Sequence, residues 1–276
     1  MVASMMPIRL AVLVMLALLP IAAAADECPR TGTETARVAA VIDGNTVRLV
    51  DGTVVRLAGI EAPEPPLAAA PEQPWPLADA AASALRKLVT GVDLQLAAAT
   101  AALDRYHRRH AYLFLAEGRS VEGELVAAGL ARARWLPGES ACLPALLARE
   151  RAARAEGLGL WTNPDYAVLK SDDPSLLRRA GLYELVEGRV VSVGHGTSMT
   201  FIDFGRNYRS DLTILVLPAV SDALARAGTP VDGLVNRRVL VRGIIEAADG
   251  PAIRLNDPAE IELVDGGGGD DESGQR

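Results

Sequence analysis

Several residue types are scarce in this chain of 276 residues, and each shortage excludes a class of protein. The two cysteines and the three histidines, His107, His110 and His195, are too few for a zinc-type ligand set. Positive charge is also short, because 28 Lys and Arg stand against 35 Asp and Glu and give a formal net charge of −7. A protein that binds nucleic acid through bulk positive charge is therefore excluded, and any such binding needs a local basic cleft.

Lysine is almost missing from the sequence. Lys87 and Lys170 are the only two, so arginine is the side chain available for holding phosphate. After residue 25, the sequence has no apolar run long enough to span a membrane. Half of the residues are nonetheless hydrophobic, which is enough for a sizeable core and excludes wholesale disorder.

Residues 1–25 have the pattern of a secretory signal peptide. One cation, Arg9, precedes the apolar run Leu10–Leu19, and small residues follow as far as Ala25. The apolar run is short for a membrane span, and the small residues before Asp26 suit a cleavage site. We therefore expect a periplasmic or secreted protein without stable membrane association after cleavage. An uncleaved N-terminal anchor is the alternative.

Cys28 and Cys142 both lie beyond the predicted cleavage site. In an oxidising compartment, two thiols in one exported chain favour a disulfide bond. Such a bond would join the mature N-terminus to the loop before a late helix and close a large ring. Two unrelated thiols are the alternative.

Residues 36–162 have the strand and helix order of a five-stranded Greek-key barrel with helices packed outside it. Alternating apolar residues and two Asp-Gly turn sequences predict an antiparallel meander at the start of this domain. Helical spacing of leucine and alanine follows a loop rich in proline. The predicted strands are Arg37–Ile42, Thr46–Val50, Thr53–Ala58, 92–99, 111–116 and 131–135, and the predicted helices are Leu77–Val89, 120–128 and 142–156.

A second domain is predicted over residues 182–264, after a polar, proline-bounded linker at 163–181. The element order of the first domain recurs, with strands predicted at Glu184–Val193, Thr200–Phe204, Leu212–Leu217, Arg238–Ile245 and around Ile253 and Ile261, and a helix at Pro218–Ala227. Residues 265–276 are acidic and rich in glycine, which predicts a disordered tail. The expected fold class is mainly β with α, with two successive barrels of the oligonucleotide/oligosaccharide-binding (OB) type.

Oxygen-bearing side chains occur at two places that the meander brings together. Asp43-Gly44-Asn45 alone is usually a hairpin turn, and Glu61-Ala62-Pro63-Glu64 alone is usually a solvated loop. Because the third strand returns beside the first, its exit at Glu61 is expected near the Asp43 turn. Carboxylate and amide oxygens there suit a hard cation such as Ca²⁺, and Glu64 just beyond suits activation of a water molecule.

Arginines are expected in the same region. Arg56 lies on the third strand, and a run of charged and aromatic residues covers 104–112. A charged run in a hairpin is usually solvated surface. Guanidinium groups beside a cation and a carboxylate would instead neutralise the charge that develops on a phosphate under attack. This pattern alone does not distinguish a solvated surface turn from a phosphate-binding site.

These blocks, in this order, resemble the thermonuclease (staphylococcal-nuclease-like) family. The matching blocks are Val41–Val47, Arg56–Glu64, Asp104–Arg108, Glu124–Ala131 and the segment that ends in Gly159-Leu160-Trp161. The resemblance spans residues 36–161 and implies a barrel enzyme that hydrolyses phosphodiester bonds of DNA, with RNA as a further candidate substrate. Residues 182–264 resemble, more loosely, an added barrel of some bacterial relatives.

The resemblance implies a role for each matching residue. Asp43, Glu61 and the backbone carbonyl of Ala62 match calcium ligands, Glu64 matches the carboxylate that orients or deprotonates the attacking water, and Arg56 and Arg108 match phosphate-binding arginines. Tyr106 and Trp135 match positions that stack on sugar or base, with barrel packing as the alternative. Arg109 adds positive charge after Arg108, either to bind phosphate or as part of the turn surface.

Asn45 departs from the family pattern, which has a second aspartate at this position. The predicted calcium site therefore has one formal charge fewer, although an amide oxygen can still coordinate the ion with lower affinity. The expected function is an exported, calcium-assisted nuclease in which Asp43, Asn45, Glu61 and Ala62 hold the ion. A weakened or inactive tandem-barrel module that binds nucleic acid or a protein partner is the alternative, motivated by Asn45 and the acidic net charge.

Overall fold

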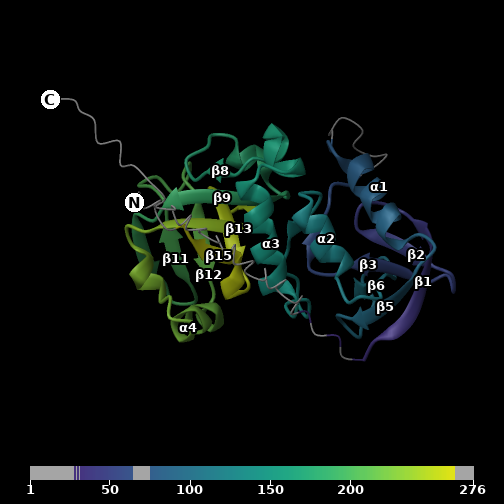
Figure 1. Ribbon diagram of the computed structural model, residues 1–276. Helices are drawn as coiled ribbons and strands as arrows, with labels where there is room; N and C mark the ends of the chain where they lie inside the picture. Colours follow the sequence, from purple (N-terminus) through teal and green to yellow (C-terminus); the bar gives the residue numbers. More distant parts are fainter. Residues whose placement is uncertain (1–27, 29, 31, 65–74, 265–276) are drawn as a thin grey trace, which may run out of the picture.

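The computed structural model describes residues 28, 30, 32–64 and 75–264. The predicted signal peptide (1–25) and acidic tail (265–276) lie outside the described residues. Two β-domains lie side by side, with the helix α3 (Leu143–Ala155) between them (Figure 1). Within the described part of the chain, every helix is too short or too polar to span a lipid bilayer.

Five strands close the first barrel, in the order β1-β2-β3-β6-β5. They are β1 (Glu34–Val41), β2 (Thr46–Leu49), β3 (Val54–Leu57), β5 (Asp93–Ala98) and β6 (Arg109–Phe114). β1 pairs with β5 through its first half and with β2 through its second half, and a register shift between Val38 and Ala40 bends it between the two partners. β3 and β6 pair in parallel and complete the circle. The predicted barrel is confirmed.

Three helices pack outside this barrel, at the places where the sequence predicts them. α1 (Ala78–Val89) buries Ala81, Leu85 and Val89, whose spacing of four residues puts them on one face. α2 (Val121–Ala127) begins at Ser120, whose hydroxyl accepts a hydrogen bond from the backbone of Gly123 at 2.8 Å. α3 packs against α2 and separates the first barrel from the second domain.

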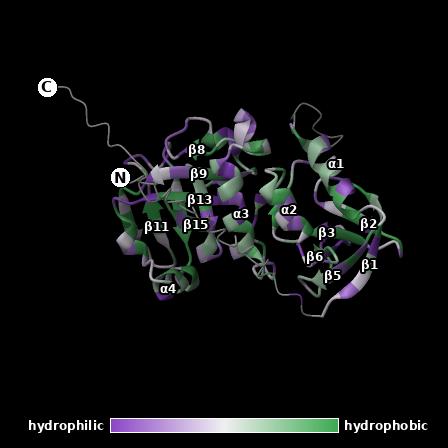
Figure 2. Ribbon diagram, in the orientation of Figure 1, coloured by the Kyte–Doolittle hydropathy of each residue, from purple (hydrophilic) through white to green (hydrophobic). Residues whose placement is uncertain are grey.

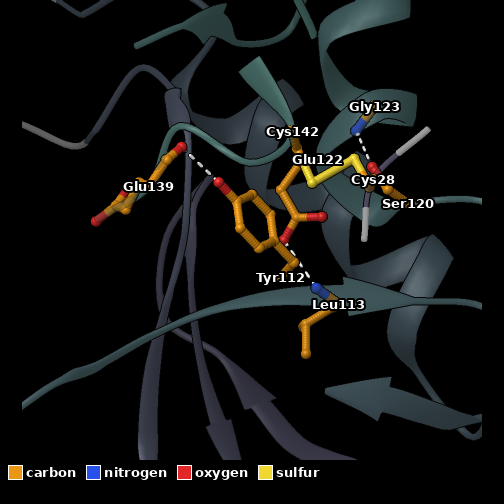
Figure 3. The surroundings of a disulfide bond; sticks show 8 residues. All are labelled: Cys28, Tyr112, Leu113, Ser120, Glu122, Gly123, Glu139 and Cys142. Atoms are coloured by element: carbon orange, nitrogen blue, oxygen red, sulfur yellow. Dashed lines mark hydrogen bonds between the residues drawn. A yellow bond between two sulfur atoms is a disulfide. The ribbon is translucent and has the colours of Figure 1, made fainter. Parts of the chain in front are cut away.

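A disulfide bond joins Cys28 to Cys142, the residue directly before α3, and their Cα atoms are 4.5 Å apart. Figure 3 shows the bond beside Glu122 of α2 and Tyr112 of β6. The Glu122 carboxylate accepts from the backbone of β6 at 3.0 Å, and the Tyr112 hydroxyl donates to the carbonyl of Glu139 at 2.5 Å. The bond therefore ties the chain before β1 to the region where α2 and α3 meet the barrel.

The second domain contains an eight-stranded sheet with the path β10-β11-β12-β14-β13-β9-β8, and β15 also pairs with β13. Its strands are β8 (Leu169–Lys170), β9 (Tyr183–Arg189), β10 (Ser192–His195), β11 (Thr200–Asp203), β12 (Thr213–Val216), β13 (Arg238–Ala247), β14 (Pro251–Leu255) and β15 (Ile261–Leu263). The helix α4 (Pro218–Arg226) follows β12 as predicted. β12 and β14 pair in parallel, as β3 and β6 do in the first barrel.

The single strand predicted at Glu184–Val193 is divided into β9 and β10. β9 pairs with β13, β10 pairs with β11, and only Val190 and Val191 separate the two strands. If β8 is set aside, the two ends of the sheet path are β10 and β9, which follow each other on one bent stretch of chain. In the first barrel, β1 likewise pairs with β5 through one half and with β2 through the other. A change of partner leaves the apolar alternation intact, so the sequence pattern does not show the break.

The predicted linker, 163–181, carries regular structure of its own. β8 pairs in parallel with β9, and the backbone of Ser171 donates to Glu187 at 3.0 Å. Short 3₁₀ helices occur in this region and elsewhere, at Gly159–Thr162, Pro164–Tyr166, Leu176–Arg179, Val231–Leu234 and Pro258–Glu260. The segment therefore packs against the second domain over part of its length.

Each domain has its own hydrophobic core. In Figure 2, green hydrophobic segments recur along the strands of both domains, and the buried residues form one cluster in each. A small ladder between β4 (Ile60–Glu61) and β7 (Arg132–Ala133) extends the first domain toward the second. From the second domain, the Tyr183 hydroxyl donates to the carbonyl of Ala133 at 2.9 Å. The β4–β7 ladder, which carries Glu61, is thus held by contacts from both domains.

Candidate active site

The turn between β1 and β2 places Asp43 and Asn45 in different surroundings. The Asp43 carboxylate accepts from the backbone of Asn45 at 2.9 Å, which stabilises the turn and leaves Asp43 half-buried. Asn45 is fully buried, and its amide oxygen accepts from the Thr46 hydroxyl at 3.0 Å. The predicted ligand Asn45 therefore has its side chain in the interior of the turn.

The Asp43 turn packs against the loop that carries the predicted catalytic carboxylate. A Cβ atom on Gly44 would lie 3.0 Å from the Cβ of Ala62 and 3.1 Å from the carbonyl oxygen of Pro63. Only glycine permits so close an approach of the two segments. The two groups of oxygen-bearing residues that the sequence predicts to be neighbours are neighbours in the structure.

Glu61, at the end of β4, binds two arginines. Its Oε2 accepts from Nη2 of Arg56 at 2.8 Å and from Nη1 of Arg134. Arg56 is only 5% exposed, and its Nη1 has no hydrogen-bond partner among the described residues. A buried guanidinium nitrogen without a partner is costly, so an acceptor such as a phosphate oxygen that reached this atom would stabilise it.

Glu64 lies where the charges of the site meet. Burial raises the pKa of the Glu64 carboxyl, and the negative charges of Glu61 and Asp43 raise it further, while Arg56 and Arg108 act to lower it. The charges of Asp43, Glu61, Arg56 and Arg108 therefore all act on Glu64, which places the five predicted groups in one region of the structure. A carboxylate of raised pKa among arginines is suited to accept a proton from water.

Asp104 fixes the direction of the Arg108 side chain. One oxygen of Asp104 accepts from the backbone of Arg108 at 2.9 Å, and the other accepts from its Nε at 2.8 Å. These hydrogen bonds hold the pKa of Asp104 well below its usual range although burial opposes them. The Arg108 guanidinium lies 5.1 Å from the ring centre of Tyr106, which is 61% exposed. Tyr106 therefore offers an exposed ring beside the predicted phosphate clamp.

A histidine and a buried glutamate extend the hydrogen-bond network of Asp104 into the protein. His110 contacts Asp104 at 3.2 Å through Nε2 and the carboxylate of Glu139 through Nδ1. The other oxygen of Glu139 accepts from the backbone of Gly59 at 2.8 Å. The network connects β6, which carries His110, to the β3–β4 corner, and the sequence analysis did not assign it a role.

The structure places Arg109 and Trp135 elsewhere around the barrel. Arg109 forms an ion pair with Glu34 of β1, because neighbouring residues of a strand point to opposite faces. Trp135 packs partly buried against the core of the first barrel and lines a hollow beside Tyr183 of the second domain. Their roles in binding substrate stay predictions.

Arg134 lies at the site although it is not among the residues predicted from the sequence. Its backbone N–H donates to the carbonyl of Gly59 at 2.8 Å, which extends the β4–β7 ladder and brings its side chain to Glu61. Its guanidinium also lies 5.3 Å from the ring centre of Tyr183. Burial acts to lower the pKa of Arg134, but the charge of Glu61 and its hydrogen bond, together with Tyr183 and Glu139, raise that pKa above its usual value. A single arginine in an alternating strand pattern carries no sequence signal for such a role.

The two predicted carboxylates face a cavity shared by the domains. Its volume is about 230 Å³, and its walls include Glu61, Ala62 and Glu64 from the first domain, Arg179 from the segment between the domains, and Tyr183 and Glu184 from the second domain. The second domain therefore forms one wall of the space in front of Glu64.

The donor chemistry of the site fits a calcium ion. Asp43 and Glu61 are close enough to raise the pKa of Glu64, and an ion of opposite charge would relieve that repulsion. Two contacts stand against tight binding, because Glu61 is already paired with Arg56 and Arg134 and the Asn45 oxygen is hydrogen-bonded inside the turn. Among the described residues, no group of three or more His, Cys, Asp or Glu side chains is gathered as a ready metal site.

Comparison with models of known protein families matches residues 54–163 to the family described as staphylococcal nuclease homologue. The match covers β3 through the 3₁₀ helix after α3 and includes Arg56, Glu61, Glu64 and Arg108. It spans less than half of the chain and leaves Asp43 outside it. No curated protein matches the sequence.

Proposed function

Because residues 54–163 form a domain of the staphylococcal nuclease homologue family, we propose that this protein is a nuclease that hydrolyses phosphodiester bonds of DNA, with RNA as a second substrate. The observation that supports the proposal most directly is the environment of Glu64. The pKa of this carboxyl is raised, and the charges of both Arg56 and Arg108 act on it. This combination supplies a base for water and cations for phosphate within one site.

In the proposed reaction, the deprotonated Glu64 carboxylate accepts a proton from a water molecule, and the resulting hydroxide attacks the phosphorus atom. As this P–O bond forms, the bond from phosphorus to the leaving sugar oxygen breaks, and that oxygen takes up a proton from solvent. The free Nη1 of Arg56 donates to a phosphate oxygen and stabilises the charge that develops there. Arg108, held by Asp104, donates on the side of the leaving oxygen. The exposed ring of Tyr106 offers a surface on which a sugar or base stacks.

Calcium assistance is part of the proposal. Asp43, Glu61 and the carbonyl of Ala62 would hold the ion, which when bound polarises the phosphate and neutralises its charge. We also propose that the protein is exported to the periplasm or secreted. Its support is the sequence pattern of residues 1–25 and the Cys28–Cys142 disulfide, which is typical of an oxidising compartment.

The test uses purified mature protein and fluorescently labelled single-stranded DNA and RNA, with calcium and with a chelator. We expect calcium-dependent cleavage by the wild-type protein and faster cleavage by Asn45→Asp at limiting calcium, because the substitution adds a carboxylate to the site. Absence of cleavage by both folded proteins at saturating calcium would contradict a nuclease.

A binding module is the second candidate, and one observation favours it. Asn45 is buried and hydrogen-bonded to Thr46, so the predicted ligand set lacks a charge and an accessible oxygen. In a module of this kind the fold would bind nucleic acid or a protein partner without cleaving it. Restored cleavage in Asn45→Asp together with an inactive wild type would identify a weakened enzyme, and silence in both would favour the module.

A further inference from the structure

We propose that the guanidinium of Arg134 competes with calcium for the Glu61 carboxylate at the proposed calcium site. The second domain holds Arg134 against Glu61. The inference rests on the proposed function only for the location of the ion. It assigns a role to a residue that lies outside the predicted ligand set, and it gives the second domain a part in metal binding.

The contact between Arg134 and Glu61 supports the competition. Nη1 of Arg134 donates to the same Glu61 oxygen that accepts from Arg56. Both partners are largely shielded, with 18% of the Arg134 side chain and 30% of the Glu61 side chain exposed. Two guanidinium groups therefore already neutralise one carboxylate, and a calcium ion at that carboxylate would meet two positive charges at close range.

The second domain fixes the position of Arg134 through Tyr183 of β9. The Tyr183 ring centre is 5.3 Å from the Arg134 guanidinium, a cation–π distance. The Tyr183 hydroxyl donates to the carbonyl of Ala133, the residue before Arg134, at 2.9 Å. Nη1 of Arg132 donates back to the carbonyl of Tyr183 at 3.1 Å. Three contacts thus hold the short strand β7 and the residue after it.

The charge balance of the site predicts whether calcium affinity rises or falls when Arg134 is replaced. Asp43, Glu61 and Glu64 would supply the negative charge around the proposed ion and Asn45 none, while Arg56 and Arg134, both hydrogen-bonded to Glu61, supply positive charge. Affinity for calcium falls as the net negative charge of its ligands falls. Removing the charge of Arg134 therefore increases the affinity, whereas a merely structural arginine would decrease it or leave it unchanged when replaced.

The experiment measures calcium binding to the whole mature protein by isothermal titration calorimetry, with calcium chloride as the probe. We expect Arg134→Gln to bind calcium at least about tenfold more tightly than wild type, and Arg134→Lys, which keeps the charge, to stay near wild type. Glu61→Gln serves as the control that weakens binding. A folded Arg134→Gln protein with equal or lower affinity, or with no binding at millimolar calcium, would overturn the proposal.

A second pair of variants tests the contribution of the second domain. Tyr183→Leu removes the ring beside Arg134, and Tyr183→Phe keeps it. We expect Tyr183→Leu to raise calcium affinity in the direction of Arg134→Gln, with no further gain in the double variant, and Tyr183→Phe to change it less. Unchanged affinity in Tyr183→Leu, with circular dichroism showing a folded protein, would remove the second domain from the proposal.

Cleavage of labelled DNA, measured on the same samples, separates the two proposals. Higher calcium affinity in Arg134→Gln without cleavage by any variant would overturn the nuclease and leave the role of Arg134 intact. Cleavage with unchanged affinity would overturn the role of Arg134 and leave the nuclease intact.

Discussion

Arg242 of β13 donates to Glu150 of α3 at 2.8 Å, and neither side chain is exposed to solvent. The pair joins the two domains, because the second oxygen of Glu150 accepts from the backbone of Ala133 in β7 at 2.7 Å. Arg242 also donates to the carbonyl of Ala133 at 3.3 Å. The strand beside Glu61 is therefore anchored by a buried ion pair that only the complete two-domain chain contains.

Removing Arg242 is expected to destabilise the protein strongly. Arg242→Ala leaves the buried Glu150 carboxylate without its hydrogen-bonded charge partner, with only Arg154 at 3.9 Å beside it, which costs about 3–5 kcal/mol of unfolding free energy. Arg238→Ala, on the same strand, removes an arginine that is 44% exposed in its pair with Glu187 and should cost less than about 1 kcal/mol. Urea denaturation measures both. Equal losses in the two variants would show that the buried pair does not hold the domains together.

Asp104 is expected to act on cleavage through Arg108. Asp104→Asn weakens the hydrogen bond to the Arg108 guanidinium, so the cleavage rate of the folded variant should fall at least about tenfold, and the loss of the carboxylate also lowers the melting temperature. Asp51→Asn is the matched control, because Asp51 also caps a turn, accepting from Thr53 at 2.9 Å, on exposed surface. Single-turnover cleavage compares the two. A similar small effect of both substitutions would contradict a positioning role of Asp104.

Glu260 is expected to make stability depend on pH. Burial raises the pKa of Glu260 to about 7, although hydrogen bonds from the backbones of Asn256 and Asp257 act to lower it. A carboxyl whose pKa is higher in the folded state stabilises the fold fully below its unfolded value of about 4.3, and this contribution is lost as the pH rises through about 7.

Denaturation curves between about pH 4 and about pH 8 check this effect of Glu260. The slope contributed by one group is at most about 1.4 kcal/mol per pH unit, and Glu260→Gln should remove it. Glu246→Gln, at an exposed pair with Arg254, should leave the slope as it is. A wild-type slope that survives in Glu260→Gln would assign the pH dependence to other groups.

The disulfide is expected to contribute to stability chiefly by restricting the unfolded chain. The ring between Cys28 and Cys142 closes over 114 residues, so replacing both cysteines with serine should cost about 3–5 kcal/mol. Thermal unfolding of wild type with and without a thiol reductant is the measurement, and the double variant should match the reduced protein. A melting temperature that is insensitive to reductant would contradict the bond.

The location of the site was predictable from the sequence because it depends on local turn chemistry. The Asp43-Gly44-Asn45 turn and the exit of β3 toward Glu61 follow from a three-strand meander, and Gly44 is the residue that lets the two segments touch. Arg56 and Glu64 follow from the same meander, whereas the role of Arg108 came from the family resemblance, and the charges of both arginines act on Glu64 in the structure. The direction of the Asn45 amide was not predictable, because it depends on one hydrogen bond to Thr46.

The contacts between the domains were not predictable, since they join residues far apart in sequence through short elements. β4 and β7 have two residues each, too few for a periodic pattern, and Arg134 follows the second of them. The break between β9 and β10 leaves the alternation of apolar residues unchanged. The contact between Arg134 and Tyr183 depends on the packing of two domains whose relative placement no local pattern encodes.

Glu64 is proposed to activate the attacking water, and three proteins compared in one assay test this role. Wild type, Glu64→Gln and Glu117→Gln are assayed for cleavage of labelled single-stranded DNA at saturating calcium, Glu117 being 53% exposed and paired with Arg119. We expect Glu64→Gln to lose cleavage by at least about a hundredfold while folding normally, and Glu117→Gln to cleave as wild type does. Cleavage by Glu64→Gln at the wild-type rate would contradict this role.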